Sequence, residues 1–252
     1  MRNLLTKITY LLILLFTMKG IASAQISTSK IELGINALLF IYQGDLTPSK
    51  FGSYRTLSPG VGIFGDYKVN HSIYLRTALA HGKLRGDDSK YSTPAWRQQR
   101  NFKFKTPVTE ISESVIWNVT RTSNDGGRRF APYITAGVAY SFLHITRDYS
   151  NYNASYFLQD AAINPGLAAD IAHPLPRGLL VFPVGAGLRY AITKNISLNT
   201  ESAYRFNSSD YLDGFSQAAN PDKKDHYFTH AIGLIFNFDK NNTPLKCPTV
   251  TH

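Results

Sequence analysis

Four carboxylates and three guanidiniums in this chain are placed so that they could pair with one another. When the alternation of apolar and polar residues is followed along the chain, these seven take the face opposite the large apolar side chains: Glu32, Asp66, Arg76, Glu110, Arg189, Glu201 and Arg205. Charges that share a narrow enclosed space must be paired to be tolerated. We therefore predict an ion-pair network that fills and stabilises an interior, and the alternative is a gated or proton-conducting passage.

Catalytic and metal-binding patterns are weaker. No spacing motif connects the residues that could serve as base and nucleophile: His81, His144, His173, His226, His230, Ser89, Ser141 and Ser208. His226 and His230 share a strand face but lie about 13 Å apart at roughly 3.3 Å per residue, too far to hold one metal ion together. A single cysteine, Cys247, excludes an internal disulfide and a paired-cysteine metal site. We expect no catalysis, no cofactor and no metal.

The elements that must position the charged residues are β-strands. The clearest runs from Tyr227 to Phe238, where one face carries Phe228, His230, Ile232, Leu234, Phe236 and Phe238, and the other carries smaller and more polar side chains. Period two is typical of a strand whose faces meet different surroundings. Here the smaller, more polar face would point inward, which inverts the pattern of a soluble protein and indicates a transmembrane β-barrel.

Eight such segments are expected as strands, at 31–41, 58–67, 72–82, 108–119, 132–143, 183–191, 196–206 and 227–238. Each approaches the roughly 9–11 residues that a tilted strand needs to cross the hydrocarbon layer. Short connections alternate with long ones at 42–57, 83–107, 144–182 and 207–226. We therefore predict an all-β, eight-stranded antiparallel outer-membrane β-barrel with a filled polar interior and both termini on the periplasmic side.

Three details of this assignment are open. Glu113 falls on the face of its apolar neighbours, so it lies near a rim or its strand is misassigned. The connection 144–182 has room for a short helix around Gln159–Ala169. Aromatic residues near strand ends suit the two membrane interfaces: Tyr67, Trp117, Tyr133, Tyr190, Phe206 and Phe238.

The N-terminus indicates export. Arg2 and Lys7 precede an apolar run at 10–16 that is too short to span a bilayer, and Ala22-Ser23-Ala24 offers a small-residue cleavage site. We assign 1–24 to a signal peptide, 25–238 to the barrel and 239–252 to a periplasmic C-terminal tail. Loss of three cations with the signal peptide lowers the formal net charge from +10 to +7. The expected location is the cell outer membrane, a compartment in which nucleic acid is a poor partner.

The long connection 83–107 is strongly basic. It carries Lys83, Arg85, Lys90, Arg97, Arg100, Lys103 and Lys105 against only two aspartates. Basic groups at a barrel rim could contact membrane lipid and anionic lipopolysaccharide.

Several short stretches resemble the small outer-membrane barrels related to PorG of the type IX secretion system. They are Tyr42-Gln43-Gly44-Asp45-Leu46, Arg100-Asn101-Phe102-Lys103-Phe104-Lys105, Glu110-Ile111, Trp117-Asn118, Tyr211-Leu212-Asp213-Gly214, Tyr227-Phe228 and Lys246-Cys247-Pro248. The resemblance implies a non-catalytic part of the secretion and gliding machinery, associated with a periplasmic ring lipoprotein and its partner protein. The periplasmic turns and the tail, with Lys246, Cys247 and Pro248, would then be the docking surface. Two alternatives remain: a surface binding or adhesion barrel that acts through its long loops, and a lipid-modifying enzyme.

Overall fold

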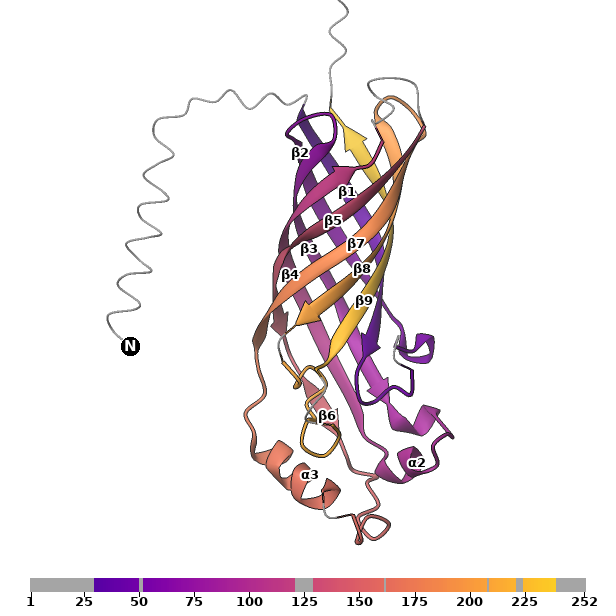
Figure 1. Cartoon of the computed structure of the whole chain (residues 1–252), viewed down its shortest axis with the longest axis vertical. Coiled ribbons are helices and arrows are strands. Elements are labelled where there is room, and N and C mark those ends of the chain that lie inside the picture. Colours follow the sequence, from indigo (N-terminus) through magenta and orange to yellow (C-terminus); the bar gives the residue numbers. More distant parts are fainter. Residues whose placement is uncertain are drawn as a thin grey trace, which may run out of the picture.

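Eight long strands close into an antiparallel barrel in the computed structural model of the chain (Figure 1). The structure describes residues 30–49, 52–120, 129–160, 162–207, 209–220 and 224–238. The long strands are β1 (Ile31–Gln43), β2 (Ser58–Lys68), β3 (Ile73–Asp87), β4 (Lys103–Asn118), β5 (Phe130–Leu143), β7 (Gly178–Ala191), β8 (Ile196–Asn207) and β9 (His226–Asn237). Each pairs with its neighbour in the chain, and pairing of β1 with β9 closes the barrel. The predicted fold class is confirmed.

The two ends of the barrel differ. The short connections 69–72 and 192–195, the start of β1 and the end of β9 lie at one end, as the pairs Ile31↔Tyr67 and Glu32↔Asn237 show. The long connections carry the remaining elements at the other end: η3 (Tyr54–Thr56), η4 (Asp88–Lys90), α2 (Trp96–Arg100), β6 (Thr146–Asp148) and α3 (Ile163–Ala172). No helix among the described residues is long and apolar enough to cross a membrane. By the usual asymmetry of such barrels, the long-connection end is extracellular.

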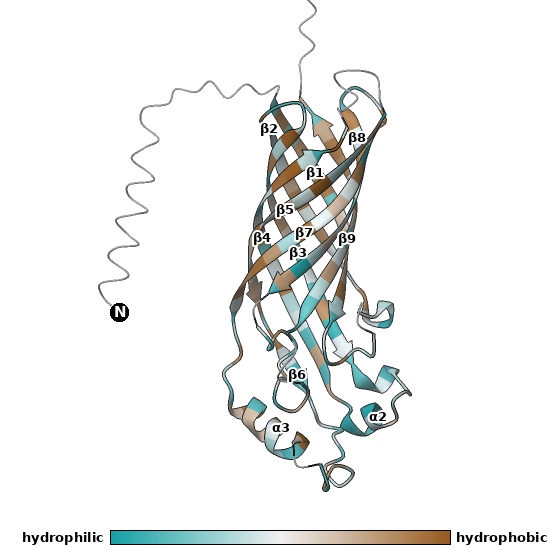
Figure 2. Ribbon diagram, viewed as in Figure 1, coloured by the Kyte–Doolittle hydropathy of each residue, from teal (hydrophilic) through white to brown (hydrophobic). Residues whose placement is uncertain are grey.

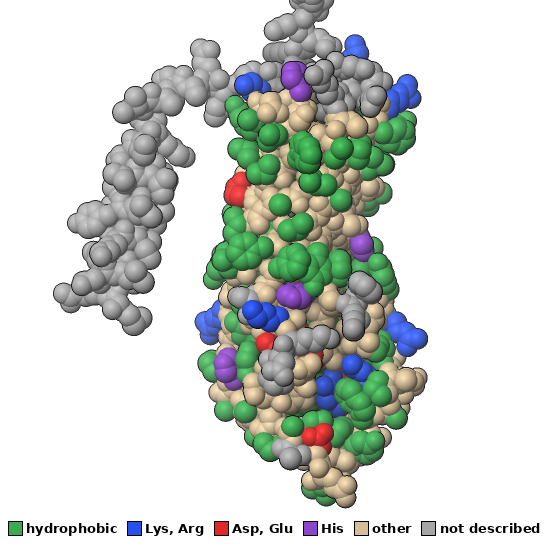
Figure 3. Space-filling view, viewed as in Figure 1, with side chains coloured by type: hydrophobic (Ala, Val, Ile, Leu, Met, Phe, Trp, Pro, Cys, Tyr) green, Lys and Arg blue, Asp and Glu red, His purple; other side chains and the backbone are tan. Residues whose placement is uncertain are grey.

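The outer wall of the barrel is apolar over most of its height, as the brown segments and the green side chains show (Figures 2 and 3). Exposed large side chains point outward from every long strand; Ile35, Val61, Leu79, Ile134 and Ile232 are examples. Glu113 is an exception within the wall: it is exposed in β4, opposite Thr77 and Val138, rather than at a rim. Strand 108–119 was therefore assigned correctly, and its outward face does include the carboxylate.

Three strands reach five residues further toward the extracellular end than predicted. β3 continues to Asp87, β4 begins at Lys103 and β7 begins at Gly178. In the β3 and β4 extensions the hydropathy reverses, because Leu84 and Phe104 point inward and are buried while Arg85 and Lys105 point outward and are exposed. Water surrounds this part of the wall, so a search for the membrane-type alternation misses these two extensions. The β7 extension keeps apolar side chains outside, with Leu180 and Phe182 exposed. The predicted loop 83–107 is in large part a paired hairpin.

The main apolar cluster lies at the extracellular mouth rather than midway along the barrel. It joins inward residues of the strand ends, including Phe40, Leu84 and Phe104, to loop residues such as Leu212 and Phe215. We call the ordered assembly formed by 44–49, 88–102, 144–177 and 209–225 (except its undescribed residues) the cap. Its helix α3 is displaced toward the C-terminus from the predicted 159–169, because 150–159 forms turns.

Candidate functional site

Five of the seven predicted interior charges meet in the half of the barrel nearer the short turns. Arg76 binds Asp66 through two hydrogen bonds of 2.7 and 2.8 Å and reaches Glu201 at 3.0 Å. Arg189 donates to Asp66 and also to Glu32 Oε2, at 2.7 Å in the second case. One carboxylate therefore bridges two guanidiniums from different sides of the barrel.

Aromatic rings line this lower ion-pair group. The guanidinium carbon of Arg76 lies 3.8 Å from the centroid of the Phe64 ring, and that of Arg189 lies 4.8 Å from the centroid of the Tyr74 ring. Tyr133 is buried and donates its hydroxyl to Glu201 at 2.9 Å. The prediction that Tyr133 lies at the membrane interface is wrong. Its side chain points from β5 into the lumen, where the hydroxyl donates a hydrogen bond to the Glu201 carboxylate.

The other two predicted charges form an upper group. Both oxygens of Glu110 accept hydrogen bonds from Arg205, at 3.0 to 3.1 Å. Tyr227 donates its hydroxyl to Glu110 Oε2 at 2.6 Å, and Arg205 also donates to Thr229. The strands thus deliver each cation to an anion from across the lumen, with hydroxyl groups completing the contacts.

Little space is left between the two groups. A cavity of about 50 Å³ touches Arg76, Glu201, Glu110 and Arg205, and it holds only a few water molecules. Side chains therefore fill the lumen, as the narrow interior of an eight-stranded barrel allows.

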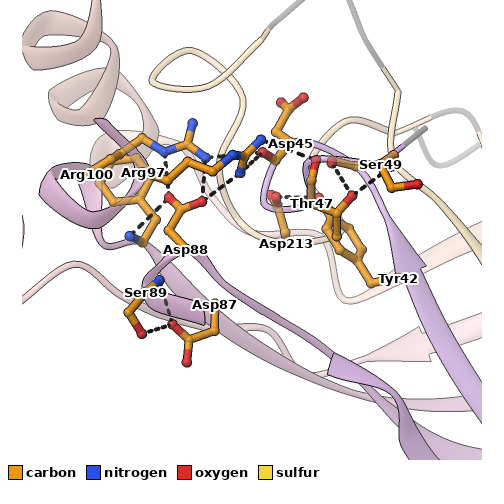
Figure 4. Close-up of polar contacts among 12 residues, drawn as sticks. Tyr42, Asp45, Thr47, Ser49, Asp87, Asp88, Ser89, Arg97, Arg100 and Asp213 are labelled. Carbon is orange, nitrogen blue, oxygen red and sulfur yellow. Dashed lines mark hydrogen bonds and ion pairs between the residues drawn. The ribbon is translucent and has the colours of Figure 1, made fainter. Parts of the chain in front are cut away.

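A third buried ion-pair group, outside the lumen, holds the cap together (Figure 4). Asp88, fully buried, accepts hydrogen bonds from Arg97 at 2.8 Å and from Arg100 at 2.6 and 3.0 Å. The same two arginines donate to the backbone carbonyl of Asp45, at 3.0 and 3.2 Å. Because η4 supplies the carboxylate and α2 supplies both cations, this group ties the β3–β4 connection to the segment after β1.

The two longest connections are joined by another buried carboxylate. Asp170, in α3, accepts hydrogen bonds from the backbone N–H groups of Ser216, Gln217 and Ala218 at 2.9 to 3.1 Å. Arg147 donates to the carbonyl oxygens of Asp170 and Gly214 at 2.6 and 2.9 Å. These bonds hold 144–177 against 209–220. Within the described part of the first segment, only β6 joins the sheet, where it pairs with the start of β4.

Two carboxyl groups of the cap share one phenol. The Tyr42 hydroxyl lies 2.6 Å from Asp213 Oδ2 and 2.6 Å from Asp225 Oδ1, and all three side chains are buried. A phenol has one proton to donate, so the second short contact needs a protonated carboxyl. Burial raises the pKa of both aspartates well above the usual range, and the charge of Asp213 raises the pKa of Asp225 further. A Cβ at Gly44 would overlap both the phenol and Asp225, so only glycine fits there.

Three of the stretches that carry the family resemblance meet in the cap. Tyr42 packs edge-on against Phe104 with ring centroids 4.6 Å apart, and Phe102 stacks on Phe215 at 4.3 Å. No site role was predicted for these residues. The signal available in the sequence was the combination of an aromatic residue, glycine and aspartate in 42–46 and 211–214 and the paired phenylalanines in 100–105, but nothing local tells which stretches come together.

The expectation of a freely basic loop at 83–107 is wrong in part. Arg97 and Arg100 are buried and bound to Asp88, so they are not available to lipopolysaccharide. Four other cations lie on the extended hairpin, where Arg85 is directly opposite Lys105 and both are exposed.

The structure brings one histidine to a serine, but not to one of the serines named above. His230 Nδ1 lies 2.7 Å from Ser202 Oγ, and Nε2 lies 3.1 Å from the Tyr54 hydroxyl, on the outer wall near the cap. Ser141 is inside the barrel beside Glu110. Within the described ranges, no cluster of three or more His, Cys, Asp or Glu side chains could hold a metal ion. The predicted docking residues Lys246, Cys247 and Pro248, and the segments 1–24 and 239–252, lie outside the described residues.

A protein-family model described as "Domain of unknown function (DUF6089)" matches residues 6–244 of the chain. No curated protein matches it. Among solved structures, the chain is similar to Neisserial surface protein A, with a TM-score of 0.48 and 14% identity over 83% of this chain and 97% of that one. It is also similar to OprG from Pseudomonas aeruginosa (TM-score 0.45, 8% identity, 84% and 97% covered). A third is Ail of Yersinia pestis in complex with the heparin analogue sucrose octasulfate, with a TM-score of 0.43 and 10% identity over 82% of this chain and 96% of that one.

Proposed function

The chain belongs to the DUF6089 family, and from that premise we propose that it is a non-catalytic outer-membrane barrel that serves as an interaction component of a type IX secretion apparatus. The observation that carries the proposal is the closed architecture. Two ion-pair groups fill the lumen and an ordered cap covers one mouth. A barrel of this kind acts as an anchor for its two rims rather than as a pore. The stretches that resemble PorG-related barrels support the secretion role.

In this proposal the periplasmic rim is the docking surface. The short connections 69–72 and 192–195, together with the tail that carries Lys246, Cys247 and Pro248, would contact the ring lipoprotein and its partner. Because the tail follows the last strand, its removal leaves the paired wall of the barrel intact.

The test is affinity purification of the tagged chain from detergent-solubilised outer membrane, beside a truncation after Phe238. We expect the ring proteins to copurify with the full chain. The truncated barrel should keep its heat-modifiable gel migration but lose the ring proteins. Copurification of the ring with the truncated form would overturn the docking role of the tail.

A second candidate, a surface binding barrel, is favoured by one specific observation. The long connections share a buried apolar cluster and buried carboxylates, so they form a folded structure that can present a fixed surface. Deleting 150–159 while leaving β4 and β5 unchanged distinguishes the candidates, because adhesion would be lost and ring copurification would persist.

The non-catalytic reading is supported by the surroundings of His230. Among the described residues its ring nitrogens hydrogen-bond only to neutral hydroxyl groups, of Ser202 and Tyr54, and the imidazole stacks on the Tyr54 ring. A serine nucleophile ordinarily needs a base whose imidazolium is stabilised by a third group, for which a carboxylate is the usual choice. A Ser202→Ala variant should therefore leave the lipopolysaccharide acylation pattern of the cell unchanged, and an altered pattern would favour a lipid-modifying enzyme.

A further inference from the structure

A surface pocket of about 730 Å³ opens at the far end of the cap, between α2, the turns at 150–160 and the start of α3. The residues that matter for its chemistry are Trp96, Tyr156, Phe157, Gln159, Asp160 and Ile163. Its volume falls within the roughly 300–1,000 Å³ of small-molecule sites. Nothing in the proposed secretion role uses this pocket, so its purpose is a separate question.

The walls of the pocket are held in place by hydrogen bonds from outside it. Asn153 is pinned to Gln99 of α2 by a backbone bond of 3.0 Å and a side-chain bond of 2.8 Å. Asn164 of α3 donates to the carbonyl of Phe157 at 3.1 Å and accepts from the Tyr152 hydroxyl at 2.6 Å. Because these bonds already order the turns, a ligand would not have to organise its own site, which favours binding.

Two aromatic rings are presented to the ligand. Tyr156 is 55% exposed and is held edge-on against the buried ring of Phe157, with centroids 4.9 Å apart. Trp96, partly exposed, lines the pocket from α2, and the guanidinium carbons of Arg97 and Arg100 each lie 4.9 Å from its ring centroid. Fixed, exposed aromatic faces in a water-facing concavity offer apolar platforms, and their negative π-faces attract polarised C–H groups.

The two charged side chains that line the pocket, Arg100 and Asp160, already form hydrogen bonds within the cap. The guanidinium of Arg100 lines the pocket but is bound to Asp88, and Asp160 is the only carboxylate in the lining. Asp160 Oδ1 accepts from the backbone N–H groups of Ala162 and Ile163, whereas its Oδ2 and the amide of Gln159 have no hydrogen-bond partner within the described residues. Among its described residues the pocket thus has no free cation for an anionic ligand, and it has polar groups that an entirely apolar ligand would leave unpaired.

We propose that this pocket binds a neutral saccharide unit. One ring face would lie on Tyr156 or Trp96, and ring hydroxyls would bond to the Gln159 amide and to Asp160 Oδ2. The unit has two possible sources, the cell's own lipopolysaccharide chains or an external polysaccharide, and both offer the same chemistry.

Tryptophan emission provides a local reporter, because the chain has two tryptophans and only Trp96 lines the pocket. Trp117 is on the outer wall near the periplasmic end of β4, so a Trp117→Phe variant leaves Trp96 as the single indole. This full-length variant, folded in detergent, is titrated with two probes: delipidated core oligosaccharide from the producing cell and a neutral glucan, maltoheptaose. A heparin oligosaccharide serves as the anionic comparison.

We expect a saturable change in Trp96 emission with at least one neutral probe, and the probe that binds identifies the source. Tyr156→Ala and Gln159→Ala should each weaken binding about tenfold. Leu158→Ala is the matched control, because Leu158 is 77% exposed in the same turn but does not line the pocket. The proposal is overturned by the absence of saturation with both neutral probes up to about 10 mM, by a response to heparin alone, or by equal effects of Tyr156→Ala and Leu158→Ala.

Discussion

The buried carboxylates of the lumen differ in how many cations hold each one. Asp66 bridges Arg76 and Arg189, so loss of one guanidinium leaves the other in contact. Glu110 has a single cationic partner among the described residues, Arg205. Removing one member of a buried pair leaves an uncompensated charge, at a cost of about 3–5 kcal/mol.

We predict that Arg205→Ala destabilises the barrel more than Arg76→Ala does. The first substitution should lower the free energy of unfolding by about 3–5 kcal/mol, because Glu110 is left without a cation. The second should have a smaller effect, because Asp66 keeps Arg189, and because Glu201, which loses its cation, is less buried and keeps the hydroxyl of Tyr133. Urea unfolding in lipid vesicles, followed by heat-modifiable gel migration, measures both.

A double variant provides the control for this comparison. Arg205→Ala alone leaves the buried charge of Glu110 without a partner. The double variant, which also carries Glu110→Gln, removes that charge, so it should be more stable than Arg205→Ala alone. Equal stability of the two, or unchanged melting of both arginine variants, would contradict the account of the interior as paired charges.

The β3–β4 hairpin combines two environments in one element. Its lower part has apolar side chains outside, and its upper part has cations outside and apolar side chains inside. Arg85 and Lys105 are directly opposite each other, and like charges so placed repel unless an anion lies between them. The pair lies above the apolar part of the outer wall, and we propose that phosphate groups of lipopolysaccharide occupy the position between the two cations.

We expect the double variant Arg85→Gln with Lys105→Gln to retain less lipopolysaccharide through purification than the unsubstituted chain. The loss should grow with salt concentration, because the contact is electrostatic and exposed. Quantifying phosphate per folded barrel checks this. Lys90→Gln is the control, because Lys90 is exposed on the same connection but its amine donates to the backbone carbonyl of Arg55. If the control and the double variant lose equal amounts of lipopolysaccharide, the opposed pair Arg85 and Lys105 has no special role.

The cap is an element whose stability should depend on pH. Burial raises the pKa of Asp210 to about 7, and it also raises the pKa values of Asp213 and Asp225 well above their usual range. In the folded cap these three carboxyls therefore bind more protons than in the unfolded chain, where aspartates titrate near pH 3.9. Their contribution to the stability of the cap is fully present below about pH 4 and falls as the pH rises through 7.

We predict that the cap of the Trp117→Phe variant unfolds at a lower urea concentration at pH 8 than at pH 5, as reported by Trp96 emission. Asp225→Asn should reduce this difference, because an amide replaces the carboxyl that must hold a proton beside Tyr42. Identical midpoints at the two pH values would show that the shared phenol does not limit cap stability.

At the scale of the whole molecule, the lumen of the barrel is closed, which suits the anchoring role that we propose. The ion-pair groups, the cavity of about 50 Å³ between them and the covered mouth all oppose the passage of ions. Function is then left to the two rims, one formed by short turns and the other by the cap.

We predict that the purified, folded chain produces no stepwise currents in a planar lipid bilayer. A filled lumen has no continuous water path, whereas a general porin reconstituted alongside should conduct. Steady single-channel steps from protein that migrates as the folded form would contradict the closed lumen and favour the gated passage.

The amino-acid sequence by itself determined the barrel, its eight strands and the face that each interior charge occupies. The reason is local: side-chain direction has period two, so Glu110 and Arg205 are assigned to the lumen as soon as their strands are recognised. The upper ends of β3 and β4 could not be predicted from the sequence, because the alternation of apolar and polar residues reverses at Leu84 and Phe104, above the apolar part of the wall.

Only the tertiary structure decided which partners meet. Asp66 bridges two arginines, and Tyr42 lies between Asp213 and Asp225, through contacts between residues that are far apart in the chain. Asp88 buries Arg97 and Arg100 over a shorter separation, but through an irregular connection that has no repeating pattern. The cap and its pocket are built from irregular connections without periodicity. Their geometry follows from buried polar groups finding partners in space, which no local pattern encodes.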